Sequence, residues 1–130
     1  MNVVSLALGC ATLRHPERLE RRIREVVRVR EELASALRGI AGVIVYPSDT
    51  NFLLVRTPFD ATAIFADLLG RGILVKNVSE PGTLNRCLRI TVGNTVENER
   101  CARALREVLN RQCSSTSMQP ISDRGGRGRA

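Results

Sequence analysis

The sequence predicts an α+β fold in which a mainly antiparallel sheet of about four short strands packs against helices. Three observations predict it: segments with apolar residues at helical spacing, short apolar runs between them, and turn residues that separate these runs. The predicted order is helix, strand, strand, helix, strand, strand, helix. At 130 residues, the chain is long enough for one domain with its own core.

The first half of this order begins with a helix over residues 16–38. Pro16 suits a first helical position, apolar residues recur every three or four positions, and glycines follow the last of them. Val43–Tyr46 and Phe52–Val55 are the first two predicted strands, because a Pro-Ser-Asp turn separates two short apolar runs.

The second half repeats the pattern of helix, strand and strand. Asp60 is positioned to cap a helix that ends at a glycine near residue 70. Ile73–Val75 and Leu88–Val92 are the third and fourth predicted strands. Asn94 and an acidic residue three positions later form a capping box, which predicts the start of the last helix.

The two ends of the chain differ in composition from the part between them. Val3–Leu13 is apolar nearly throughout, so we expect a buried helical segment over residues 1–14. Residues 113–130 are rich in Ser, Gly, Arg and Pro and poor in apolar residues, so we expect a disordered tail. Residues 15–112 are then the folded domain.

The charge pattern bears on the possible partners. The net charge is +7, but acids are interleaved with the arginines of residues 14–38, which is typical of a solvated helix face. A basic chain can also indicate a nucleic-acid partner. The chain has few aromatic residues on which bases could stack, so we do not expect nucleic acid as the partner.

Several other classes of site are excluded by what the sequence lacks. No two of the four cysteines share a metal-site spacing, so we predict reduced cysteines, a cytoplasmic protein and no metal site. The apolar segment near the N-terminus is too short for a membrane span, and no basic residues precede it as in a signal peptide. We find no nucleophile–base pair, so no residue is predicted to be catalytic.

Two basic residues in the last two predicted strands form the candidate site. Arg89 lies in mid-strand, where side-chain alternation turns Leu88 and Ile90 toward the helices and Arg89 away from them. A guanidinium there is costly without an anionic partner, and its planar fork suits a carboxylate or a phosphate. Lys76 ends the neighbouring strand. We therefore predict that Arg89 and Lys76 bind an anionic substrate.

Each of these two residues also has a simpler interpretation. Arg89 could form an internal ion pair with Glu80 or Asp49. Lys76 could be an ordinary edge-strand lysine that discourages aggregation. Nothing around Lys76 indicates the desolvation or the neighbouring base that a Schiff-base lysine needs.

Three runs of the sequence resemble a known family. They are P-S-D-T-N-F-L-L-V-R, L-L-G-R-G-I-L-V-K-N and P-G-T-L-N-R-C-L-R-I-T-V-G, and they are similar to the C-terminal part of histidinol-phosphate aminotransferases. The resemblance implies a two-domain, homodimeric enzyme of fold type I that uses pyridoxal phosphate. Such an enzyme transfers an amino group between histidinol phosphate, a phosphorylated amino alcohol, and glutamate or 2-oxoglutarate in histidine biosynthesis.

The resemblance also assigns roles to residues. Arg89 matches the arginine that holds the substrate carboxylate or phosphate, and Lys76 stands where the family usually has a second, phosphate-binding arginine. Residues 1–14 match the junction with a large domain, which carries the family's cofactor lysine. Since no such lysine motif occurs in these 130 residues, we expect a substrate-binding fragment that is inactive alone. The alternative is a stand-alone α+β module that binds an anionic ligand or nucleic acid.

Overall fold

The computed structural model describes residues 9–10 and 13–116, and these residues confirm the predicted α+β order. The helices pack against a sheet of short strands. The elements are α2 (Pro16–Arg38), β1 (Ile44–Val45), β2 (Phe52–Arg56), α3 (Ala61–Gly70), β3 (Lys76–Asn77), β4 (Cys87–Thr91) and α4 (Thr95–Thr116).

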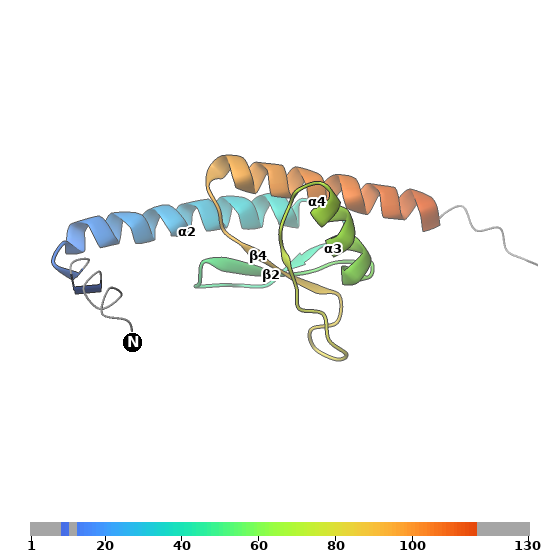
Figure 1. The fold of residues 1–130 in the computed structure, drawn as a ribbon, viewed down its shortest axis with the longest axis horizontal. Helices are drawn as coiled ribbons and strands as arrows, with labels where there is room; N and C mark the ends of the chain where they lie inside the picture. Colours follow the sequence, from blue (N-terminus) through green and yellow to red (C-terminus); the bar gives the residue numbers. More distant parts are fainter. Residues whose placement is uncertain (1–8, 11–12, 117–130) are drawn as a thin grey trace, which may run out of the picture.

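The strands form one antiparallel sheet in the order β1-β2-β4-β3. The central strands β2 and β4 pair along their full length, from Phe52–Thr91 to Arg56–Cys87. The edge strands β1 and β3 contain two residues each. In Figure 1, α2 and α4 run along one side of the sheet, and no described helix covers the opposite side.

The core lies between the sheet and these helices. Leu53 and Val55 of β2 and Leu88 and Ile90 of β4 are at most 2% exposed. They alternate with more exposed neighbours, except at the start of β4, where Cys87 is also buried. They pack with Leu33 and Leu37 of α2 and with Leu105 and Val108 of α4. Burying one such side chain contributes about 1.5–3 kcal/mol, so this layer is the main source of stability.

Both predicted helix caps are confirmed. The Asp60 carboxylate accepts the Ala63 N–H at 3.1 Å at the start of α3. Asn94 and Glu97 form a reciprocal capping box, in which each side chain accepts the other residue's backbone N–H at 2.9 Å. Each cap satisfies backbone donors that the first turn of a helix leaves unpaired.

The third strand lies later in the chain than predicted. The structure pairs Lys76–Asn77 with β4, whereas Ile73–Val75 is not part of the sheet. Gly72 has a left-handed backbone (φ 72°), and the Ile73 N–H donates to the Leu68 carbonyl, so this segment stays attached to the end of α3. The predicted bounds were wrong because an apolar run that packs on a helix has the same composition as a strand.

The last helix extends into the predicted tail. Disorder was expected from residue 113, but α4 continues to Thr116. In this last part of the helix, the hydroxyls of Ser114 and Ser115 donate at 3.0 Å to backbone carbonyls one turn earlier. Residues 117–130 lie outside the described residues.

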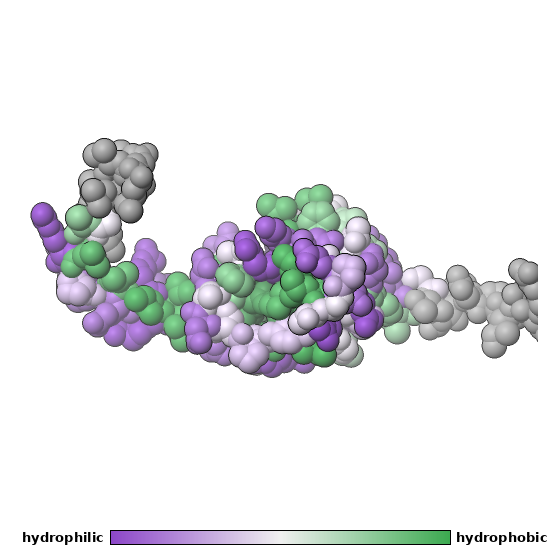
Figure 2. Space-filling view, turned by 90° about the horizontal axis from the view of Figure 1, so that it is seen from below, coloured by the Kyte–Doolittle hydropathy of each residue, from purple (hydrophilic) through white to green (hydrophobic). Residues whose placement is uncertain are grey.

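The N-terminal half of α2 projects beyond the sheet. At 1.5 Å per residue, the 23-residue helix is about 34 Å long, and its buried residues begin only at Val29. Ile23, Val26 and Val27 are 53%, 38% and 40% exposed. Figure 2 shows this apolar stripe along the projecting helix. The predicted apolar stripe of α2 is therefore present, but no other described element covers its N-terminal half.

The predicted buried segment over residues 1–14 is only partly described. Gly9 and Cys10 are helical and exposed, and Leu13 is 73% exposed. These residues are not buried, because they precede the projecting half of α2 and lie away from the sheet (Figure 1). Residues 1–8 and 11–12 lie outside the described residues. None of the described helices has an apolar stretch long enough to cross a bilayer.

Candidate functional site

The side of the sheet that faces away from α2 and α4 carries the candidate site, and we call it the open face. Because side chains alternate along each strand, the residues between the buried positions of β2 and β4 point to this face. The open face comprises Phe52, Leu54 and Arg56 of β2, Arg89 and Thr91 of β4, and Lys76 of β3.

The two predicted site residues lie directly opposite each other. The register of β3 and β4 pairs Lys76 with Arg89, although thirteen positions separate them in the sequence. Side chains opposed in this way share a face, with their Cβ atoms about 4.5–5.5 Å apart. Two like charges at this spacing repel each other, and an anion between them would remove the repulsion. The structure thus places both cations side by side on one face of the sheet.

An aromatic ring supports the guanidinium of Arg89. Its Cζ atom lies 5.0 Å from the centre of the Phe52 ring, a contact worth about 0.5–2 kcal/mol. The Arg89 Nε atom is buried and has no hydrogen-bond partner among the described residues. Neither Glu80 nor Asp49 forms an ion pair with Arg89, although the structure describes both carboxylates. The internal ion pair considered from the sequence is therefore not formed.

Lys76 is exposed at the edge of the sheet. This position agrees with a ligand-binding cation and equally with an ordinary edge-strand lysine. Only its alignment with Arg89 favours the first interpretation. The substrate-binding role of both residues stays a prediction.

The open face carries a third cation, Arg56, which the sequence reasoning missed. Its Cζ atom lies 5.5 Å from the centre of the Tyr46 ring, and its Nη2 donates to the Thr83 carbonyl at 2.8 Å. The period of two from Phe52 would have placed Arg56 on this face. The predicted strand, however, ended one residue too early, at Val55.

Figure 2 looks onto the open face from below. Apolar surface occupies its centre, and hydrophilic side chains surround it. Two of the most exposed apolar residues of the described chain, Ile44 at 51% and Leu74 at 81%, belong to the segments that flank β2 and β4. A large apolar area with cations beside it is typical of a surface that binds a ligand or another domain.

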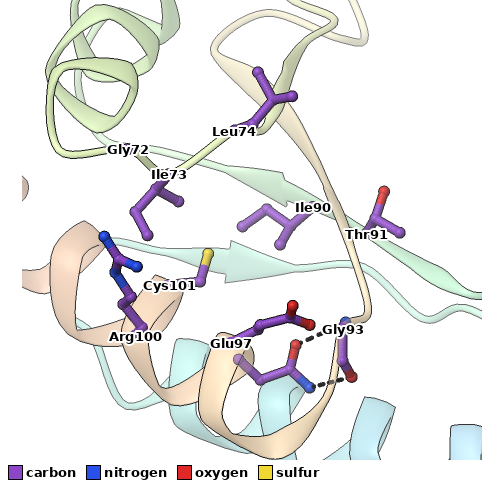
Figure 3. A pocket seen from close by; sticks show the side chains of 10 residues that line it. Gly72, Ile73, Leu74, Ile90, Thr91, Gly93, Glu97, Arg100 and Cys101 are labelled. Atoms are coloured by element: carbon purple, nitrogen blue, oxygen red, sulfur yellow. Dashed lines mark hydrogen bonds between the residues drawn. The ribbon is translucent and has the colours of Figure 1, made fainter.

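Besides the open face, the structure has a groove between the start of α4 and the segment before β3, which we call the edge groove. Its volume is about 390 Å³. Figure 3 shows Ile73, Ile90 and Cys101 pointing into it, with Arg100 on one side and Glu97 on the other. The groove exists because the segment before β3 does not pair with the end of β4.

Three polar side chains of the edge groove already have structural partners. Glu97 caps the first turn of α4, and Arg100 donates to the Arg71 carbonyl at 3.3 Å. The Asn98 side chain accepts the Gly93 N–H at 2.9 Å and donates to the Gly93 carbonyl at 3.1 Å, as the dashed lines in Figure 3 show. These contacts close the turn between β4 and α4.

The chemistry available in the edge groove is limited. Burial raises the pKa of the Cys101 thiol to about 11, so the thiol is protonated at neutral pH and is a poor nucleophile. Within the described part of the chain, no group of three or more His, Cys, Asp or Glu residues could hold a metal ion. The open face, rather than this groove, is therefore the candidate site.

Comparison with known proteins agrees with the fold and with the family that the sequence resembles. The profile of the family described as aminotransferase class I and II matches residues 3–108. This chain belongs to the class I and II aminotransferase family. Members of the family with similar sequences include the histidinol-phosphate aminotransferase of Aquifex aeolicus, 43% identical over 99 residues, and histidinol-phosphate aminotransferase 2 of Nitrosococcus oceani, 44% identical over 96 residues.

These alignments cover 76% and 72% of this chain but only 28% and 27% of the two family members. The chain therefore spans less than a third of the length of the curated relatives it matches. Among solved structures of the family, the histidinol-phosphate aminotransferase of Sinorhizobium meliloti in complex with pyridoxal-5'-phosphate matches with a TM-score of 0.70 and 28% identity. That match covers 78% of this chain and 28% of the other.

A second solved structure gives a similar fit. The L-threonine-O-3-phosphate decarboxylase of Porphyromonas gingivalis matches with a TM-score of 0.70 and 26% identity, over 85% of this chain and 35% of the other. The α+β arrangement of this chain is thus shared with larger enzymes of different named activities.

Proposed function

We propose that residues 15–112 form the small, substrate-binding domain of a pyridoxal-phosphate-dependent histidinol-phosphate aminotransferase. In this proposal, Arg89 and Lys76 hold the anionic group of the substrate. The observation that carries the proposal is the direct pairing of these two residues on the open face. The motifs of β2 and β4 and the 43% identity to a histidinol-phosphate aminotransferase support the choice of family member.

The pair suits the substrates of such an enzyme. Histidinol phosphate presents a phosphate, whereas glutamate and 2-oxoglutarate present carboxylates, so one site must bind both kinds of anion. The planar fork of Arg89 can donate two parallel hydrogen bonds to either group. Lys76 contributes a point charge with rotatable donors, which adapts to either shape.

The described residues do not supply a site for the cofactor. Pyridoxal phosphate needs a lysine and a charged partner for its ring nitrogen. Lys76 is the only lysine of the 130 residues, it is exposed, and the strands carry no carboxylate on the open face. We therefore expect another part of the enzyme to bind the cofactor, and we expect these 130 residues alone not to transaminate.

The exposed apolar stripe of α2 supports a partner of this kind. Ile23, Val26 and Val27 of α2, and Leu13 just before it, are exposed apolar side chains, so covering them with another surface would be favourable. We propose that a cofactor-binding domain, in the same or a second subunit of a homodimer, covers this stripe.

The test of the anion site is a calorimetric titration of the full chain with histidinol phosphate and with inorganic phosphate. Arg89→Gln should weaken the binding of both ligands roughly ten- to a hundredfold, because the substitution removes charged hydrogen bonds to the anion. The control is Arg103→Gln, because Arg103 is exposed on α4, away from the open face. This variant also removes one positive charge, but it should change the affinity by less than about twofold. Equal effects of the two variants would contradict the proposed site.

The cofactor part of the proposal has a separate test. The full chain is mixed with pyridoxal phosphate, and the absorbance spectrum and transamination of histidinol phosphate are recorded. We expect the spectrum of the free cofactor and no turnover. A stable lysine-bound cofactor with turnover would contradict the assignment of this chain to the substrate-binding domain alone.

A further inference from the structure

We propose that Arg56 is a positioning residue for the anion site: it holds the loop between β3 and β4 and thereby keeps Lys76 opposite Arg89. The inference rests on the proposed anion-binding function of that pair. It adds a third open-face residue, which acts through the loop rather than on the ligand.

The loop over residues 78–86 is tied to the sheet mainly at its ends. The Val78 N–H donates to the Cys87 carbonyl at 3.2 Å, and the Arg86 N–H donates to the Ser79 hydroxyl at 2.9 Å. The loop tip, residues 80–83, is exposed. Among the described residues, the hydrogen bond from Arg56 Nη2 to the Thr83 carbonyl is the one link between this tip and another element.

Arg56 is well placed to hold the tip. It ends β2 opposite Cys87 of β4, so its side chain rises from the sheet beside the end of the loop. The Tyr46 ring supports its guanidinium at 5.5 Å, which restricts the orientation of the donors. Its buried Nε has no acceptor, which is costly. Replacing Arg56 should therefore cost the fold little overall.

The position of Lys76 depends on this loop. β3 pairs with β4 at only two positions, Lys76–Arg89 and Asn77–Leu88. Its side-chain anchor is the Asn77 amide, which donates to the Thr62 hydroxyl at a long 3.3 Å and accepts the Ser79 N–H at 2.9 Å. On one side, β3 follows Val75, which is buried in the core, but on the other side it continues directly into the loop. A movement of the loop therefore displaces Lys76 from that side.

The experiment is a double-mutant cycle on the full chain, with inorganic phosphate as the ligand. Arg56→Gln should weaken phosphate binding about three- to tenfold when Lys76 is present, and less than about twofold when Lys76 is replaced by Gln. Arg56→Lys should not restore the affinity, because an ammonium lacks the planar group that stacks on Tyr46 while donating to Thr83. Arg103→Gln is the control for the loss of one charge.

A ligand-free measurement accompanies the cycle. In Arg56→Gln, the amides of Asn85 and Cys87, which close the turns of the loop, should exchange with deuterium at least about threefold faster. The amides that pair β2 with β4 should exchange at an unchanged rate. Circular dichroism confirms that each variant is folded.

Three results would overturn the inference. The first is that Arg56→Gln weakens phosphate binding equally with and without Lys76, and the second is that Arg56→Lys restores the full affinity for phosphate. Either result would show that Arg56 acts only through its charge. Unchanged exchange at Asn85 and Cys87 would show that it does not hold the loop. If the unmodified chain binds no phosphate, the proposed function fails, while the exchange measurement still decides whether Arg56 orders the loop.

Discussion

Replacing Asn98 by alanine tests how the turn between β4 and α4 is held. Asn98 is a polar residue of α4 that is only 7% exposed. Its side chain makes two hydrogen bonds to Gly93, one to the N–H at 2.9 Å and one to the carbonyl at 3.1 Å. Alanine removes both bonds and leaves a half-buried backbone donor and acceptor without these partners.

The size of the effect follows from those contacts. Each hydrogen bond contributes about 1 kcal/mol net, and a buried group left without a partner adds a desolvation cost. The better helix propensity of alanine returns about 0.5 kcal/mol. We therefore expect Asn98→Ala to lower the free energy of unfolding by about 2–3 kcal/mol, which corresponds to roughly 10–20 °C in Tm for a domain of this size.

Thermal and urea unfolding of the full chain, followed by circular dichroism, measure this difference. Asn110→Ala is the matched control, because Asn110 is exposed on the same helix and its side chain has no comparable role. The control should change the free energy of unfolding by less than about 0.5 kcal/mol. If the two variants have the same stability, the account of the turn is wrong.

Two further predictions concern individual side chains. Lys76→Arg should tighten phosphate binding about three- to tenfold in calorimetry, because the guanidinium fork adds a hydrogen bond; an affinity no higher than that of Lys76→Gln would show that residue 76 does not contact the anion. Burial raises the pKa of the Cys101 thiol to about 11, so the thiolate is disfavoured in the folded state. The protonated Cys101 thiol therefore contributes to the free energy of unfolding below about pH 9, and this contribution is lost as the pH rises toward 11. Cys101→Ala should flatten the fall in Tm over this range, and an identical pH profile in both proteins would contradict the buried, protonated thiol.

Features that depend on neighbours in the sequence were predicted correctly. The caps at Asp60 and at Asn94–Glu97 form as expected, because a cap involves only residues within one helical turn. The alternation of β4 also placed Arg89 on the face away from the helices: Leu88 and Ile90 are buried against the helices, whereas Arg89 is partly exposed on the opposite face.

The bounds of β3 show where local reasoning ends. Ile73–Val75 is apolar and follows a glycine, as a strand would, yet the sheet begins only at Lys76. What decides this is the attachment of Ile73 to the end of α3, at Leu68. That contact depends on how α3 packs against the sheet, and the composition of residues 73–75 does not predict it.

The sequence by itself determined the α+β class, the order of the elements, the family and the face of β4 that carries Arg89, since these follow from periodicity and short motifs. Only the tertiary structure decided that Lys76 lies opposite Arg89, that Phe52 and Tyr46 support two guanidiniums, and that Arg56 reaches the loop at Thr83. The physical reason is register. A shift of one residue between strands turns every side chain to the other face, and the register depends on the packing of all the strands and helices together.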